Sequence, residues 1–131
     1  PNYAMVGRWL AHMPYGRFRH AAIANAKPVP GEGMLGWSAH YLIGIAFAAL
    51  LALVAGRGWF LHPTLAPALM TGIATVAAPF LLLQPGMGAG IAARKSTHPT
   101  EARIHSLLTH ALFGLGLYLT GSMLSRFPLE I

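Results

Sequence analysis

Three long apolar stretches limit what this chain can fold into more than any other feature of its sequence. The last of them has no charged residue across 104–125, which is about the length that an α-helix needs to cross a bilayer. Two similar stretches precede it, at about residues 34–55 and 64–84. Because backbone polar groups inside lipid must be satisfied internally, such stretches predict membrane-spanning helices.

The composition also favours a membrane protein. Hydrophobic residues make up 55% of the 131 residues and charged residues only 9%, whereas a soluble chain has roughly 25% charged residues. So few charges cannot cover a water-exposed surface. We therefore predict an all-α, multi-pass transmembrane protein with spanning helices at about 34–55, 64–84 and 103–124. A basic interfacial segment, residues 1–33, precedes the helical domain of residues 34–131.

The N-terminal segment combines cations with aromatic rings, as in Arg8 beside Trp9 and in the Arg-Phe-Arg run at 17–19. Such residues suit a headgroup interface, where rings are half-buried and cations meet phosphates. A short helix is expected over residues 4–13, ended by Pro14 and Gly16. The expected partners of this basic face are anionic lipid headgroups rather than nucleic acid, because the basic residues flank apolar segments instead of forming a long run.

The distribution of Lys and Arg predicts an orientation in the membrane. Four of these residues precede the first apolar stretch, one lies between the first two, three lie in residues 94–103, and one follows the last. Positive charge collects on the cytoplasmic side of membrane proteins. The N-terminal segment and the loop 94–103 are therefore predicted to be cytoplasmic.

Histidines in the apolar stretches are the candidate ligand-binding residues. Ionisable groups inside a membrane are functional candidates by default, and His40, His105 and His110 are of this kind. The predicted topology places all three in the cytoplasmic leaflet, together with Gln84 and Met87. Imidazoles can ligate the metal of haem or (bacterio)chlorophyll, carry protons, or simply hydrogen-bond across helices. All three interpretations stay open.

Small residues in the first apolar stretch predict close helix packing. They recur at multiples of four residues, with His40 in the missing place, and so lie on one helix face. Rows of this kind let helix backbones approach each other closely in lipid. The predicted packing residues are Gly36, Gly44, Ala48, Ala52 and, one turn after His110 in the last helix, Gly114.

The sequence argues against catalytic and metal sites. It has no cysteine and no aspartate, and its only acids are Glu32, Glu101 and Glu130, none of which lies within an apolar stretch. Thiolate chemistry and paired-carboxylate mechanisms are thereby excluded or disfavoured. The glycine-rich stretch before Lys95 and Ser96 is no Walker loop, because Arg94 stands where that motif has glycine.

Five stretches, read together, carry a family resemblance. They are AMVGRWL at residues 4–10, GRFRH at 16–20, GWSAHYLIGIAF at 36–47, QPGMGAGIAA at 84–93 and SLLTHALFGLGLY at 106–118. The chain resembles the small bacterial inner-membrane proteins grouped as domain-of-unknown-function family 2938. The resemblance implies an inner-membrane location and one further hydrophobic helix before Pro1, which makes four in all. That family has no assigned activity, so the resemblance implies no catalytic residue.

The sequence therefore predicts a non-enzymatic protein, an accessory or scaffolding subunit that packs against other membrane subunits or copies of itself. One alternative is a haem- or pigment-binding subunit with His40, His110 and His105 as ligands. Another is a small transporter or channel with the histidines along its path. Visible colour in the purified protein would favour the first alternative, and a pH-dependent flux lost in His110→Ala would favour the second.

Overall fold

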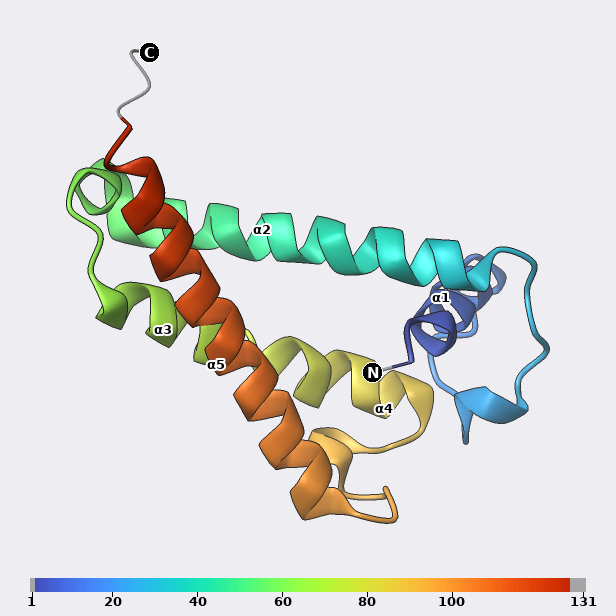
Figure 1. Cartoon of the computed structure of the whole chain (residues 1–131). Coiled ribbons are helices and arrows are strands. Elements are labelled where there is room, and N and C mark those ends of the chain that lie inside the picture. The colour runs from blue at the N-terminus through green and yellow to red at the C-terminus, as the bar shows by residue number, and fades with distance from the viewer. Residues whose placement is uncertain (1, 128–131) are drawn as a thin grey trace. The chain divides into compact units, whose positions relative to one another are not determined.

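A computed structural model describes residues 2–127, and this part of the chain is helical without any strand (Figure 1). The α-helices are α1 (Tyr3–His12), α2 (Glu32–Leu61), α3 (Leu65–Ala74), α4 (Gln84–Met87) and α5 (Pro99–Leu124). Three short 3₁₀ helices lie at Met13–Tyr15, Ile23–Asn25 and Ile91–Ala93, and a π-helical segment at Pro79–Leu83. The last four residues of the predicted domain 34–131 lie outside the described residues.

Three helical segments are long and apolar enough to cross a membrane. They are Glu32–Leu61, Leu65–Met87 and Pro99–Leu124, and the most apolar window of each is only 6%, 17% and 11% buried. A soluble protein would bury such surface in a core. The prediction of an all-α chain with three helices that can span a membrane is confirmed.

The first span is longer than the sequence indicated. Its α-helical backbone is broken at Gly56, whose φ of 71° suits glycine, and helical conformation then resumes to Leu61. Residues 56–63, which separate the first two predicted spans, are therefore mostly helical. Trp59 explains the difference: its side chain is buried, and its indole N–H donates to the carbonyl of Thr64 at 2.9 Å.

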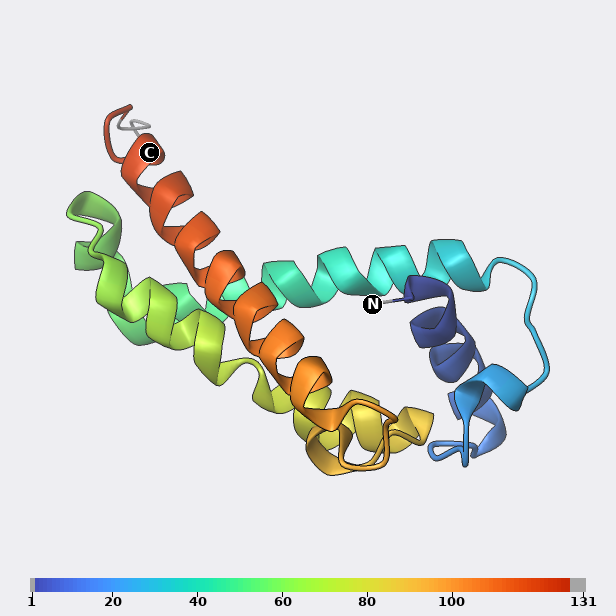
Figure 2. The same ribbon diagram turned by 60° about the horizontal axis from the view of Figure 1, so that its bottom comes forward.

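The second span is interrupted in its middle, as Figure 2 shows after α3. Pro79 has no N–H to donate to the carbonyl four residues earlier, at Thr75. The amide of Val76 bonds to the carbonyl of Ile73, which tightens the turn, and the π-helical segment begins at Pro79. A proline inside an apolar helical stretch predicts a kink, and here the interruption starts four residues before Pro79.

The described chain divides into two compact units. The first combines Pro1–Gly44 with Ala77–Ile104, and the second combines Ile45–Val76 with His105–Ile131. This division joins the basic N-terminal residues to the loop before α5. The boundary proposed at residue 33 on sequence grounds stays a prediction.

In the first unit, α1 lies against the first turns of α2 (Figure 1). Glycines permit the contact: a Cβ atom added at Gly7 would overlap the carbonyl of Glu32, and one at Gly36 would overlap the carbonyl of Tyr3. Trp9 contacts α4: a Cβ atom added at Gly86 would lie 2.6 Å from the indole nitrogen of Trp9. The N-terminal segment is thereby packed between α2 and α4.

In the second unit, α3 and α5 approach through glycine. A Cβ atom added at Gly72 would lie 2.5 Å from the carbonyl oxygen of His110 and 2.7 Å from the Cα of Gly114. Near this crossing lies a small apolar core of Leu51, Trp59 and Ala68. Close backbone approach of this kind is how helices associate where lipid removes the hydrophobic drive.

Candidate functional site

Arg8 organises the N-terminal segment of the first unit. Its guanidinium donates to both carboxylate oxygens of Glu32, at 2.9 and 2.7 Å, and to the carbonyls of Ala24 and Ala26, both at 3.2 Å. Glu32 also accepts from the amide of Val29 at 2.9 Å. One buried arginine thus connects α1, the following loop and the start of α2.

The Arg8–Glu32 pair has the geometry of a structural ion pair. The fork of the guanidinium matches the two carboxylate oxygens, which is the strongest arrangement of such a pair. These hydrogen bonds to Glu32 raise the pKa of Arg8 above its usual value, so Arg8 stays charged at every physiological pH. Arg8 and Glu32 form hydrogen bonds with each other and with the backbone, so we assign them a structural role and not a catalytic one.

In the second unit, His110 sits beside the interruption of the second span. Val76 does not donate to the carbonyl of Gly72, so that oxygen is left to accept from the Thr75 hydroxyl at 2.6 Å. The Nδ1 atom of His110 lies 3.0 Å from the same hydroxyl and 3.2 Å from the same carbonyl. The network therefore satisfies a carbonyl exposed by the break.

This geometry selects one tautomer of His110. The Gly72 carbonyl can only accept, and the Thr75 hydroxyl has a single hydrogen, which it donates to that carbonyl. A hydrogen on Nδ1 of His110 then completes the network, whereas a bare lone pair there would face two oxygen atoms. We therefore place the hydrogen on Nδ1, which leaves the lone pair of Nε2 free for a ligand or a donor.

His40, in the first unit, belongs to an aromatic cluster at the start of α2. Its Nε2 lies 3.4 Å from the hydroxyl of Tyr3, and their rings are 4.5 Å apart. Trp37 lies 4.2 Å from Tyr3 and 5.9 Å from Tyr41, measured between ring centroids. Trp37 is 48% exposed and Tyr41 is 65% exposed, which suits rings at a membrane interface.

The histidines predicted to act together fall in different units. His40 belongs to the first and His110 to the second, so their pairing stays a prediction. His105 is exposed, and its carbonyl accepts from the Thr109 hydroxyl at 2.8 Å. Among residues 2–127, no group of three or more His, Asp or Glu side chains is arranged to bind a metal ion.

The predicted packing residues divide into two kinds. Gly36 contacts α1, and a Cβ added at Gly114 would lie 2.8 Å from the carbonyl oxygen of Ala68. Gly44 is different, because a Cβ added there would have nothing within 4 Å. Ala48 and Ala52 are partly exposed. The open positions on α2 remain candidates for contact with another helix.

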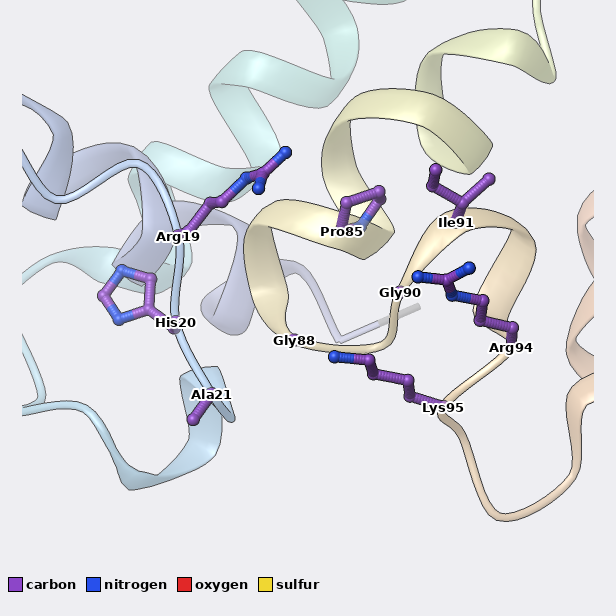
Figure 3. Close-up of a pocket in the computed structure, with 9 residues that line it drawn as sticks. All are labelled: Arg19, His20, Ala21, Pro85, Gly88, Gly90, Ile91, Arg94 and Lys95. Atoms are coloured by element: carbon purple, nitrogen blue, oxygen red, sulfur yellow. The ribbon is translucent and has the colours of Figure 1, made fainter.

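The first unit also contains a basic cavity of about 330 Å³ (Figure 3). Residues 19–21 form one wall and residues 85–95 form the other. Arg19, Arg94 and Lys95 supply three cations, and neither described carboxylate lines the cavity. In Figure 3 the side chains of Arg94 and Lys95 extend toward Gly90 and Gly88.

The backbone before Arg94 is strained. Ala92 and Ala93 both have positive φ, at 49° and 56°, a conformation that residues with a side chain rarely adopt. Strain of this kind costs roughly 1–3 kcal/mol per residue and collects at functional sites. The Arg103 side chain donates to the carbonyl of Ala92 at 2.8 Å and so stabilises the turn.

Several of these features were missed by sequence reasoning. Gly7 and Gly72 were not singled out, because each is a lone small residue whose partner lies on another helix. Glu32 carried a usable signal: it is one of three acids in the chain and stands just before an apolar stretch. Nothing in the sequence indicated that Arg19 and Lys95 line one cavity.

Comparisons with known proteins give a family and no function. The chain matches the family described as "Protein of unknown function (DUF2938)" over residues 1–124. No curated protein and no solved structure matches it. The match covers the aromatic cluster, the His110 network and the basic cavity alike. It confirms the resemblance seen in the sequence, and the chain belongs to the DUF2938 family of proteins of unknown function.

Proposed function

We propose that this protein is a non-enzymatic, multi-pass subunit of the bacterial inner membrane that packs against other membrane helices as an accessory or scaffolding subunit. The observation that carries the proposal is the low burial of its three spans, whose most apolar windows are 6%, 17% and 11% buried. Lipid or other helices must cover the remaining surface. Those helices belong either to copies of this chain or to another subunit.

Open glycines support association through helix faces. Built Cβ atoms at Gly44 on α2 and at Gly116 on α5 have nothing within 4 Å. Glycine weakens a helix by roughly 1 kcal/mol relative to alanine, so an open glycine on an exposed helix face is best explained by a backbone that approaches it.

The chemistry of the described residues supports a non-enzymatic role. Glu32 is engaged by Arg8, and Glu101 is an exposed side chain that lies 3.9 Å from His98. An acyl-transfer site needs a nucleophile, a base and a group that orients the base. Within residues 2–127, neither carboxylate forms a hydrogen bond with His40, His105 or His110, so no acid of this part of the chain orients one of these histidines.

The proposed orientation has the N-terminal segment and the loop 94–103 in the cytoplasm. The first unit contains seven of the nine Lys and Arg residues, and only Arg57 and Arg126 belong to the second. The two segments that the positive-inside rule assigns to the cytoplasm therefore belong to one compact body. In this orientation the cations meet anionic headgroups of the inner leaflet.

The proposal is tested by extracting the protein gently from its native membrane and measuring complex mass by native mass spectrometry. Gly44→Leu adds bulk to an open face of α2, and Ala46→Leu adds similar bulk two residues on, at another face of the same helix. We expect native mass spectrometry to detect the native protein as part of a complex. The complex should be absent for Gly44→Leu and retained for Ala46→Leu. A native monomer, or equal behaviour of the two variants, would contradict the proposal.

A second candidate function is haem or pigment binding, favoured by His110. Histidines that ligate metals commonly donate their other ring N–H to a backbone carbonyl, and Nδ1 of His110 lies 3.2 Å from the carbonyl of Gly72. An absorption spectrum of natively extracted protein tests this. A Soret or near-infrared band lost in His110→Ala would support it, and a flat spectrum would leave His110 as an interhelical hydrogen-bond donor.

A further inference from the structure

The basic cavity of the first unit has the composition of an anion site. Three of its nine lining residues, Arg19, Arg94 and Lys95, are cations (Figure 3). Its volume of about 330 Å³ lies at the lower end of the range for small-ligand sites, roughly 300–1,000 Å³. That is room for one phosphate group and part of the molecule that carries it.

No carboxylate among the residues that line the cavity balances its three cations. The carboxylates of residues 2–127 are Glu32 and Glu101, and neither lines the cavity. Glu32 is bonded to Arg8 at 2.7 Å and so is committed elsewhere. Cations gathered at one concave surface create a positive potential that attracts and concentrates anions.

The two walls of the cavity are joined by backbone contacts. The amide of His20 donates to the carbonyl of Gly86 at 2.9 Å and so joins the two walls, and the amide of Lys95 donates to the carbonyl of Ala89 at 2.8 Å within the second wall. Gly88 has a φ of 100°, and a Cβ atom added there would overlap the carbonyl of Ala21. The cations therefore extend from fixed backbone, which lowers the entropy lost when a ligand binds.

Backbone strain next to the cavity points in the same direction. Ala92 and Ala93 adopt positive φ immediately before Arg94 and Lys95, the two cations of that wall. Without a functional requirement at these two positions, the backbone would relax or the positions would be glycine. The strained turn directs two consecutive cationic side chains to one cavity.

We infer that this cavity binds the phosphate group of a phosphomonoester, carried either by an anionic lipid headgroup or by a soluble compound. Arginine forks bind two phosphate oxygens at once, and lysine adds a point charge, so Arg19, Arg94 and Lys95 suit a dianionic group. The inference is independent of the packing role proposed above, because neither of the open glycines Gly44 and Gly116 lines the cavity.

The test uses the full chain in phosphatidylcholine nanodiscs, with two probes. Inorganic phosphate, added to discs without anionic lipid, reports a soluble ligand by calorimetry. Discs that contain about a tenth phosphatidic acid report a lipid ligand, as adducts in native mass spectrometry. The test variant is Arg94→Gln with Lys95→Gln, and the matched control is Arg17→Gln with Lys27→Gln, which removes two exposed cations of the same unit outside the cavity.

We expect one of the probes to bind, and its affinity to fall at least about tenfold in the cavity variant and less than about twofold in the control. Calorimetric binding of inorganic phosphate would identify a soluble ligand, and phosphatidic acid adducts alone would identify a lipid. Equal losses in the two variants would overturn the inference, because general surface charge would then explain binding. Absence of binding by both probes would overturn it as well. Because Arg94 and Lys95 are exposed, the variant is expected to keep its thermal stability, which serves as the folding check.

Discussion

The two units of this protein are stabilised by different interactions. The first unit combines glycine contacts at Gly7 and Gly36 with charged and polar side chains, since Arg8 bonds to Glu32 and to two backbone carbonyls. The second depends on glycine contacts between α3 and α5 and on one network of Thr75, His110 and the Gly72 carbonyl. Close backbone contact through glycine is common to both units, whereas ion pairs among residues 2–127 occur only in the first, which contains the basic segments predicted to face water and headgroups. The comparison shows that different parts of one helical chain can be stabilised by different kinds of interaction.

Of the three variants that test this comparison, Gly72→Ala at the glycine crossing of the second unit is expected to have the largest effect. Gly72→Ala places a Cβ 2.5 Å from the His110 carbonyl oxygen and 2.7 Å from the Cα of Gly114, and both are backbone atoms that cannot rotate away. We expect a loss of about 2–3 kcal/mol in the free energy of unfolding, measured by SDS titration in bicelles with tryptophan fluorescence. Gly116→Ala is the matched control, because its Cβ has nothing within 4 Å. Equal stability of the two variants would contradict backbone contact as the stabilising interaction.

A smaller but well-localised effect is expected at Arg8 in the first unit. Arg8→Met leaves Glu32 without its main partner, and we expect amide hydrogen exchange in α1 and in residues 22–32 to accelerate by more than about tenfold. The double variant Arg8→Met with Glu32→Gln removes the unpaired charge as well and should exchange more slowly than the single one. Arg17→Met, at an exposed arginine, serves as control and should exchange like the native protein. If the single variant behaves like the control, the ion pair does not organise this unit.

The smallest effect is expected at Thr75 in the second unit. Thr75→Val keeps the shape but removes the hydroxyl that lies 2.6 Å from the Gly72 carbonyl and 3.0 Å from Nδ1 of His110. Hydrogen bonds between helices in membranes contribute about 0.6 kcal/mol on average, so we expect a loss of about 1 kcal/mol for this doubly used group. Thr75→Ser retains the hydroxyl and should lose less. A Thr75→Ser variant as unstable as Thr75→Val would show that packing, not the hydroxyl, matters here.

Much of the fold could be predicted from the sequence, because membrane-spanning helices follow from length and hydropathy alone. The three spans, the short N-terminal helix and the interruption near Pro79 all come from local features of this kind. The extension of α2 to Leu61 could not be foreseen, because it depends on where Trp59 packs. Local patterns report backbone propensity and do not report which side chain fills a distant space.

The candidate sites were harder to predict because their members are distant in the sequence. Thr75 lies 35 residues from His110, and Arg19 is remote from Lys95, so no motif connects them. The histidines could be identified as candidates because histidine is rare inside apolar stretches. The cations of the cavity lie among other charged residues and could not be distinguished from them. Classes of catalytic chemistry were easier to exclude, because a chain without cysteine and aspartate cannot use those side chains in any fold.

We propose that the chain spans a membrane with both basic segments of the first unit on the cytoplasmic side, and cysteine labelling tests this directly. Because the protein has no cysteine, Ala22→Cys, Thr97→Cys, His62→Cys and Ser125→Cys each introduce a single thiol. The measurement is labelling by a membrane-impermeant maleimide in spheroplasts and in inverted vesicles. We predict that Ala22→Cys and Thr97→Cys label only in inverted vesicles and that His62→Cys and Ser125→Cys label only in spheroplasts. Labelling of Ala22→Cys and Thr97→Cys from opposite sides, or of all four from both sides, would contradict this topology.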